Sequence, residues 1–312
     1  MRPTRRHVAG YLFGLAAGAV WGTTGPLSTA VYAEGGALTG IGFWRILFGT
    51  IVLAAYGLFA GGLFRMDRRG YLWVGALGGF FFALFEIAYQ FGIAGAGVAG
   101  ASALLYLAPV MVALVARPIL GERLTLLRLV LASVVMVGAW LTVRGGHPGL
   151  GGVPITSLAA GVAGGVGAAV SFAGSTVLQR WAVPRYGMLR VLFWQLVGGT
   201  VILAVVVPAA GQPLTPPPTL DGWLYVLALT AGTVLGANYL FMAAVKRIDA
   251  APTSVAATVE PVVGALLALA LFDQRLEPLG WLGLAMVVGG VVGGYVQEAK
   301  EDSKTSPPVA TT

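Results

Sequence analysis

The stretch FWRILFG at residues 43–49 returns as FWQLVGG at residues 193–199, and this pair decides how the chain is organised. A longer match accompanies it. Residues 70–124 align with 222–276 at a constant offset of 152, with GYLWVGAL against GWLYVLAL and GERL against DQRL, whereas the first pair aligns at an offset of 150. The sequence therefore contains two copies of one unit, and only the first copy carries the arginine, Arg45.

The composition is typical of a membrane protein. Of the 312 residues 57% are hydrophobic and 10% are charged, and the mean hydropathy is +0.85, whereas soluble proteins carry about 25% charged residues. Apolar segments of about twenty residues, long enough to cross a hydrocarbon core of about 30 Å, follow one another along the chain. We expect an all-α membrane protein with ten transmembrane helices, at about 8–31, 39–61, 70–92, 97–117, 125–143, 155–180, 189–208, 220–244, 250–272 and 278–296.

Each copy of the repeat holds five of these helices, in residues 8–143 and 155–296. Because five is odd, the second copy must lie inverted in the bilayer. Inverted repeats place a site near the midplane and allow two equivalent conformations, each open to one side. We therefore expect a central cavity and transport by alternating access. The polar, proline-containing segment 297–312 is predicted to be a disordered cytoplasmic tail.

The basic residues predict the orientation. Sixteen of the nineteen Lys and Arg residues fall in segments that the ten helices would place on the same side as the N-terminus. The positive-inside rule then puts both termini in the cytoplasm and the helices in the inner membrane. The basic residues form short clusters between apolar segments, so the lipid bilayer is the expected partner and nucleic acid is not. The N-terminus also resembles a signal peptide, but the equivalent segment in mid-chain argues against that interpretation.

Short motifs connect the repeat to a known family. AVWG at 19–22, LAPV at 107–110 and LGERLT at 120–125 resemble the EamA domains of the drug/metabolite transporter superfamily, and the resemblance covers about 8–296 in two copies. It implies a ten-helix bundle of two inverted repeats and an exporter of amino acids or other metabolites. The length and the aromatic content are similar to those of the bacterial aromatic amino acid exporters.

The second copy departs from the family pattern at two positions. Gln274 stands where the first copy has Glu122, and Glu260 precedes the proline where the first copy has Ala108. The two GER-like turns would lie on opposite sides of the membrane, so they need not do the same job.

Three ionisable residues fall at membrane depth: Arg45, Glu86 and Glu260. Each costs at least about 2.5–3.5 kcal/mol there and is a functional candidate. Arg45 and Glu86 lie at the same predicted depth, about 9 Å below the outer helix ends at 1.5 Å per residue. Three interpretations of Arg45 are open: snorkelling to the outer headgroups, a gating or structural ion pair with Glu86, and binding of a substrate carboxylate. Proton coupling through Glu86 would require that it is unpaired.

The second copy carries neutral residues at the equivalent positions. Gln195 corresponds to Arg45 and Asn238 corresponds to Glu86, so we expect a hydrogen-bonded pair near the inner face. Glu260 lies halfway along the predicted helix 250–272, beside Pro261. It either lines the cavity and binds a substrate amine or a proton, or is satisfied by neighbouring helices.

Aromatic and uncharged polar residues complete the candidate site. Tyr106 and Ser102 are one helical turn apart and would face the same way, and an aromatic lining would suit an apolar or aromatic group, with core packing as the alternative. The candidate substrate-binding residues are Trp21, Tyr89, Gln90, Ser102, Tyr106, Gln179, Asn238, Tyr239 and Glu260.

The leading functional prediction is a secondary transporter that exports amino acids or similar small amphiphilic metabolites; a multidrug or other metabolite exporter of the same fold is the alternative. The sequence holds no GxxxxGK[ST] pattern, so ATP is not the expected energy source, and proton coupling is left open. An intramembrane enzyme is disfavoured because His7 and His147 flank the membrane and the chain has no Cys. We therefore expect no catalytic residues, metal or cofactor. A channel is disfavoured because inverted halves create a closed central site.

Overall fold

The computed structural model describes residues 5–108, 111, 126–145, 156–245, 247, 257 and 259–305 of the chain. The elements in these ranges are all helices. The first copy contains α1 (Arg5–Gly22), α2 (Thr24–Ala33), α3 (Leu38–Ala60), α4 (Arg68–Gly70), the π-helix η1 (Tyr71–Leu77), α5 (Gly78–Leu105) and α7 (Leu126–Arg144). The second contains α8 (Leu158–Tyr186), α9 (Met188–Ala209), α10 (Leu220–Leu229), the π-helix η2 (Thr230–Gly236), α11 (Ala237–Val245), α13 (Glu260–Phe272) and α14 (Pro278–Thr305).

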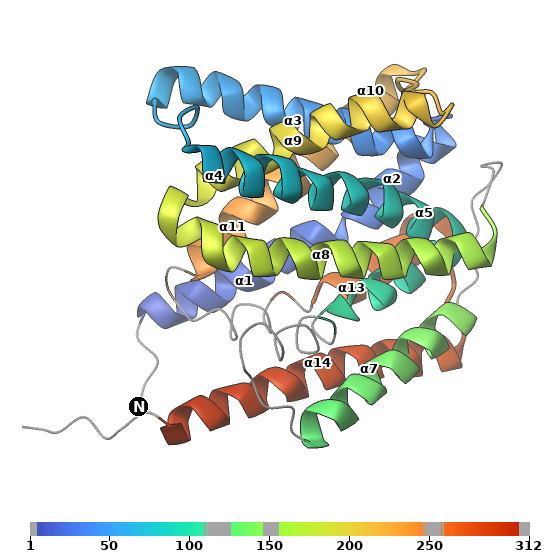
Figure 1. The fold of residues 1–312 in the computed structure, drawn as a ribbon. Coiled ribbons are helices and arrows are strands. Elements are labelled where there is room, and N and C mark those ends of the chain that lie inside the picture. Colours follow the sequence, from blue (N-terminus) through green and yellow to red (C-terminus); the bar gives the residue numbers. More distant parts are fainter. Residues whose placement is uncertain are drawn as a thin grey trace, which may run out of the picture.

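Five helical segments of the described chain are long and apolar enough to cross a membrane: Leu38–Ala60, Arg68–Leu105, Leu158–Tyr186, Met188–Ala209 and Leu220–Phe241. The other five predicted crossings coincide with α1 and α2, with the limb of α5 that follows the Gly97 bend, and with α7, α13 and α14, whose apolar stretches are shorter, so the count of ten stays a prediction. The start of α1 and the last turn of α14 lie at the same end of the bundle (Figure 1).

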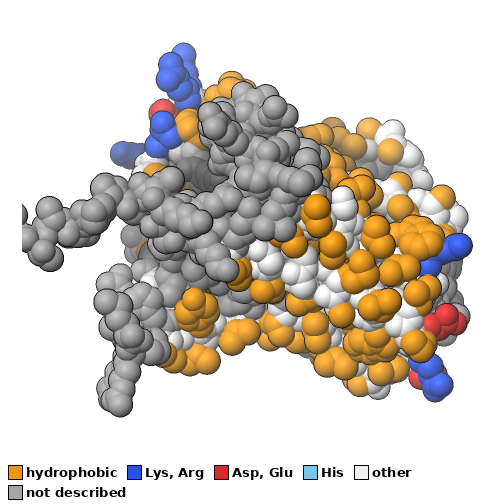
Figure 2. All heavy atoms as spheres, turned by 90° about the horizontal axis from the view of Figure 1, so that it is seen from below, with side chains coloured by type: hydrophobic (Ala, Val, Ile, Leu, Met, Phe, Trp, Pro, Cys, Tyr) orange, Lys and Arg blue, Asp and Glu red, His pale blue; other side chains and the backbone are white. Residues whose placement is uncertain are grey.

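The flank of the bundle is apolar. Phe59 is 92% exposed and Leu58 75% exposed on α3, and Val205 on α9 is 63% exposed. Figure 2 shows hydrophobic side chains spread over the part of the flank that is seen from below, with Lys, Arg, Asp and Glu side chains at its ends. In water such a surface would drive association, so the flank is suited to lipid.

Equivalent residues of the two copies meet between α3 and α9. The hydroxyls of Thr50 and Thr200, which correspond at the offset of 150, lie 3.1 Å apart. The residues beside them make reciprocal contacts: Gly49 packs against Leu196, and the residues equivalent to these, Gly199 and Ile46, also pack together. Such reciprocal contacts are what a twofold axis produces. The helices are antiparallel, because Thr39 at the start of α3 bonds the carbonyl of Pro213 beyond the end of α9.

The same relation holds between α7 and α14, here at the offset of 152. Gly138 packs against Gly283, Met286 and Val287, and Gly290 packs against the corresponding residues Leu131, Val134 and Val135. The approximate twofold axis between the copies therefore passes through two separate helix pairs, which supports the inverted repeat.

The prediction of one continuous helix at 8–31 is wrong, because the structure has two helices there. α1 ends at Gly22 and α2 begins at Thr24, and the Thr23 hydroxyl donates to the Val20 carbonyl oxygen at 2.7 Å. Pro26 has no N–H and cannot bond the carbonyl of Gly22 as a continuous helix would require. The break also brings Gly22 against the carbonyl oxygen of Glu260, where no larger residue fits.

The helices predicted at 97–117 and 250–272 also differ from the structure. α5 ends at Leu105, and Tyr106 and Leu107 form a turn; α13 begins at Glu260, after a turn at Val259. Leu107 and Val259 correspond at the offset of 152, and each lies two residues before a proline in the sequence. Proline disfavours helix before it and suits the first turn of a helix after it. The other ends of both predicted helices, toward residues 117 and 250, lie outside the described ranges.

The boundary predicted between 92 and 97 is a sharp bend instead of a loop. Gly97 has φ 75° and ψ 171°, which only glycine adopts readily, and helix continues on both sides of it. At the other end of the chain, α14 runs on to Thr305, past the expected start of disorder at 297. Glu, Ala and Lys in QEAKEDSK are good helix formers, which accounts for the extension. Residues 306–312 of the predicted tail lie outside the described chain.

Candidate functional site

Arg45 on α3 and Glu86 on α5 form a buried ion pair. Arg45 Nε lies 3.2 Å from Glu86 Oε2, and the two residues are 4% and 2% exposed. Their side chains meet inside the bundle, so Arg45 does not snorkel to headgroups. A buried pair of this kind holds two helices together only while both charges are present, because a single buried charge is costly.

Two threonines of the second copy hydrogen-bond to Arg45. Arg45 Nη2 donates to Thr233 Oγ1 at 3.1 Å, and the hydroxyl of Thr230 donates to the Arg45 carbonyl oxygen at 3.1 Å. Both threonines belong to η2, and single-turn π-helices often mark functional positions. The pair thus joins α3, α5 and the π-helix of the opposite half.

The expected hydrogen bond between Gln195 and Asn238 is wrong. Gln179 Nε2 donates to Gln195 Oε1 at 3.1 Å, and Gln195 Nε2 donates to Ser175 Oγ at 3.3 Å, so the partners of Gln195 are on α8. Asn238 Nδ2 donates to the Val234 carbonyl oxygen at 2.8 Å. The short Asn side chain reaches a carbonyl in the preceding turn of its own helix and does not cross to α9.

Glu260 lies where three breaks in the chain meet. It begins α13, the Tyr106 hydroxyl at the end of α5 lies 3.4 Å from its Oε2 atom, and the α1–α2 break at Gly22 packs on its backbone. The Tyr106 hydroxyl also lies 3.3 Å from the Ala257 carbonyl oxygen. Glu260 therefore starts a helix rather than sitting halfway along one, and the positive end of the helix dipole stabilises its negative charge. Broken helices at corresponding positions of two repeats are typical of transporter substrate sites.

Tyr89 and Ser102 lie between the ion pair and Glu260. The Tyr89 hydroxyl is 3.1 Å from Ser102 Oγ, and the Tyr89 ring stacks on Phe85 at 5.4 Å between centroids. Both polar residues are 2% exposed. Because they stand on opposite sides of the Gly97 bend, this hydrogen bond ties the two limbs of α5 together. Ser102 therefore faces Tyr89 as well as preceding Tyr106 by one turn.

Gln90 has a partner that sequence reasoning missed. The Tyr32 hydroxyl of α2 donates to Gln90 Oε1 at 2.5 Å, and both residues are almost fully buried. Tyr32 falls one residue beyond the predicted first helix, so nothing in the sequence analysis placed it in the core. Its spacing from Gly25 and Ser28 was the signal that could have found it.

Two aromatic candidates have different surroundings. Trp21 donates from Nε1 to the Thr233 carbonyl oxygen at 3.1 Å, and its ring lies 5.3 Å from that of Phe241. Tyr239 is 61% exposed on the outside of α11, whose buried face carries Ala237 and Ala244. The structure thus brings Trp21 to the ion-pair region and contradicts a cavity-lining position for Tyr239.

The end of the bundle at which α1 begins is rich in basic residues and carries hydrogen bonds between the two copies. Arg190 Nε donates to the Gly62 carbonyl oxygen at 2.7 Å. The Tyr186 hydroxyl donates to Asp67 Oδ1 at 2.7 Å, and this bond, together with one from the Gly70 N–H, lowers the pKa of the Asp67 carboxyl.

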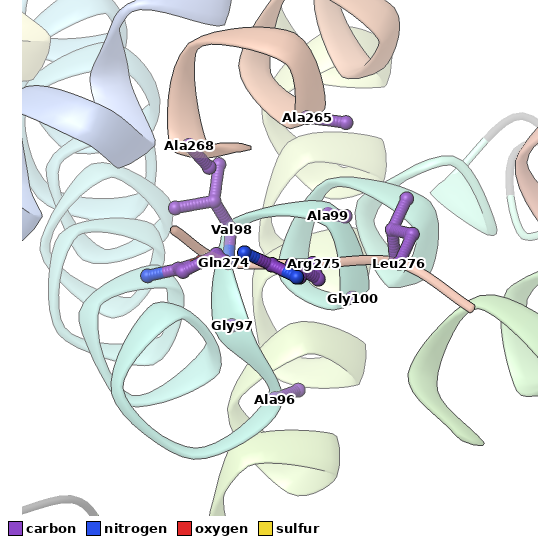
Figure 3. Close-up of a pocket in the computed structure, with 10 residues that line it drawn as sticks. All are labelled: Ala96, Gly97, Val98, Ala99, Gly100, Ala265, Ala268, Gln274, Arg275 and Leu276. Carbon is purple, nitrogen blue, oxygen red and sulfur yellow. Dashed lines mark hydrogen bonds between the residues drawn. The ribbon is translucent and has the colours of Figure 1, made fainter. Parts of the chain in front are cut away.

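A small, mostly apolar pocket lies at the opposite end, between the Gly97 bend and the loop after α13 (Figure 3). Gln274 crosses to this bend, and its Oε1 atom accepts the N–H of Val98 at 3.2 Å. The residue that replaces the Glu of the GER motif thus ties the two copies together. Glu122 itself lies outside the described residues. Within the described ranges, no three His, Cys, Asp or Glu side chains gather to hold a metal ion.

The model of the EamA-like transporter family matches residues 8–144 and again 159–295, one match for each copy. The chain belongs to the EamA-like transporter family. It is therefore a membrane transporter, and the relatives named below are also transporters.

The chain is similar to three curated relatives and to one solved structure, among others. A protein of Archaeoglobus fulgidus described as an uncharacterized transporter is 25% identical over 269 residues, 86% of this chain and 90% of its own length. The uncharacterized inner membrane transporter YedA of Escherichia coli (strain K12) is 34% identical over 133 residues, 41% of this chain and 42% of its own. A probable terminal-alkyne amino-acid exporter of Streptantibioticus cattleyicolor is 27% identical over 282 residues, 87% and 88% of the two chains. A solved crystal structure with 22% identity and a TM-score of 0.66 covers 95% of this chain and 99% of its own, and supports the fold.

Proposed function

We propose that this EamA transporter exports amino acids, with aromatic ones as the first candidates, or similar small amphiphilic metabolites across the inner membrane by alternating access. The observation that carries the proposal is the Glu260 carboxylate at the junction of three broken helices. Arg45 is already held by Glu86, and Glu260 has no cationic partner among the described residues. A substrate amine or a proton would supply the missing positive charge.

The substrate class also draws on a relative. The Streptantibioticus cattleyicolor protein is described as an amino-acid exporter, and an amino acid carries the amine that Glu260 would bind. Exporters of drugs or other metabolites on the same fold are the alternative. Uptake and efflux of a panel of radiolabelled amino acids, amines and organic acids in proteoliposomes, with and without a pH gradient, test the substrate class and the coupling. Transport of acids without an amine, and of nothing else, would contradict the assignment of Glu260.

The proposed orientation places both termini in the cytoplasm, with ten crossings. Its support is the clustering of Arg65, Arg68, Arg69, Arg185 and Arg190 near the α3–α4 and α8–α9 connections, at the end that holds the N-terminus.

Alternating access leads to a prediction for Thr50 and Thr200. When two inverted repeats exchange conformations, a contact on the axis between them maps onto itself and is kept in both states. We expect a disulfide between Thr50→Cys and Thr200→Cys, whose present hydroxyls are 3.1 Å apart, to leave transport within about twofold of the reduced protein. The chain has no other cysteine, so the cross-link is unambiguous. Transport that stops on oxidation and returns on reduction would contradict a fixed axis here.

Tyr106 gives a prediction about substrate affinity. If its ring and hydroxyl line the site beside Glu260, Tyr106→Ala should weaken substrate binding by about tenfold, since it removes an aromatic contact and a hydrogen bond. Tyr106→Phe, which keeps the ring, should lose less. Equilibrium binding of the transported amino acid measures the affinity of both variants. Unchanged affinity in Tyr106→Ala would mean that Tyr106 only packs in the core.

A further inference from the structure

Helix α2 presents a polar stripe to α5. Its residues Gly25, Ser28, Thr29 and Tyr32 are spaced i, i+3, i+4 and i+7, so they share one face of the helix. That face contacts α5 at both ends of the stripe: Gly25 packs on Val98, and the Tyr32 hydroxyl bonds Gln90. We call Ser28, Thr29, Tyr32 and Gln90 the α2 seam.

Three side chains of the α2 seam are buried without hydrogen bonds. Ser28 Oγ, Thr29 Oγ1 and Gln90 Nε2 have no partner within the described part of the chain, and each residue is 0% exposed. Buried polar groups are normally paired, and leaving one unpaired costs about 1–3 kcal/mol. A seam that holds three such groups is better suited to a conformation in which something else bonds them.

The unpaired groups are all able to donate. Gln90 Nε2 is an amide nitrogen, which only donates, while Gln90 Oε1 already accepts the Tyr32 hydroxyl. The two hydroxyls can donate as well. A cluster of unpaired hydrogen-bond donors is suited to a carboxylate, whereas Glu260, near the α1–α2 break, is an acceptor suited to an amine. The two sites together match the two charges of an amino acid.

We propose that the α2 seam is a transit site for the substrate carboxylate. The ten-residue helix α2 is separated from α1 by the break at Gly22 and Thr23, so it can move off α5 as a unit. Ser28, Thr29 and Gln90 then bond the carboxylate as the substrate passes from Glu260 toward the end of the bundle opposite the N-terminus. The inference rests on the proposed function, because it needs an amino-acid substrate.

Removal of the two hydroxyls tests the transit site. The double variant Ser28→Ala with Thr29→Val should export a transported amino acid at least about tenfold more slowly, the loss expected for hydrogen bonds to a charged group. Its thermal stability should be unchanged or higher, because unpaired groups are removed. The matched control is Ser171→Ala with Thr142→Val: both residues are 0% exposed, but each hydroxyl bonds a carbonyl of its own helix at 2.8 Å. The control should export at the wild-type rate.

Thiol labelling tests the chemical class. Ser28→Cys would be the single cysteine of the chain, and the transported amino acid should slow its reaction with a small membrane-impermeant thiol reagent in proteoliposomes. The corresponding amine without a carboxylate should not. Equal protection by both compounds, no labelling under any condition, or wild-type export by the Ser28 and Thr29 double variant would overturn the transit site alone. A wild-type protein that exports no amino acid would overturn the proposed function as well.

Discussion

Glu260→Gln should abolish most export while the protein stays folded. The variant keeps the shape of the side chain and its contact with Tyr106 but removes the negative charge that would bind the substrate amine. A hydrogen bond to a charged group contributes about 1.5–3 kcal/mol, so a loss of about tenfold to a hundredfold in transport rate at low substrate concentration is expected. Efflux from proteoliposomes at several pH values measures it.

The control for this variant is Glu34→Gln. Glu34 lies at the end of the bundle, where its Oε2 atom accepts the Thr219 hydroxyl at 2.8 Å, and its neutralisation should change export by less than twofold. If Glu260→Gln exports at the wild-type rate at every pH, Glu260 neither binds the substrate nor carries a coupled proton.

Removing one charge of the pair formed by Arg45 and Glu86 should lower the free energy of unfolding more than removing both charges. Arg45→Gln leaves a buried carboxylate without its partner, and Glu86→Gln leaves a buried guanidinium; each should lower the free energy of unfolding by about 3–5 kcal/mol. The double variant should recover much of that loss, because no unpaired charge remains, and the second copy already carries glutamine at the position of Arg45. Thermal unfolding of the four proteins in detergent forms the double-mutant cycle.

The exposed pair Arg275 and Asp273 is the control for this cycle. Its side chains are 73% and 70% exposed, and Arg275→Gln should change stability by less than about 1 kcal/mol. Single variants of the buried pair whose effects add in the double variant would show that Arg45 and Glu86 act independently.

Much of the organisation follows from the FWRILFG and FWQLVGG pair. The two copies and the family could be predicted from the internal repeat and its short motifs, and the ion pair of Arg45 and Glu86 was one of the interpretations that the sequence left open. The reciprocal contacts around Thr50 and Thr200 express the same repeat in three dimensions.

The helix breaks and the partners of the polar residues were harder to predict. The length of an apolar segment does not reveal a helix break such as the one at Gly22, because the residues on both sides of the break are equally hydrophobic. Which helices become neighbours is set by packing, so the bond from Arg45 to Thr233 in the other copy and the α8 partners of Gln195 could not be read from spacing. Tyr239 was assigned to the interior by depth alone, and depth does not say which side of a helix faces lipid.

Substrate exchange tests the central claim most directly. Proteoliposomes that contain the protein are loaded with unlabelled amino acid and diluted into buffer with a trace of the labelled compound. A carrier that alternates between two sides should accumulate the label transiently above its equilibrium level, and Glu260→Gln should not. Label that only equilibrates, at the same rate with and without internal substrate, would contradict alternating access by this EamA transporter.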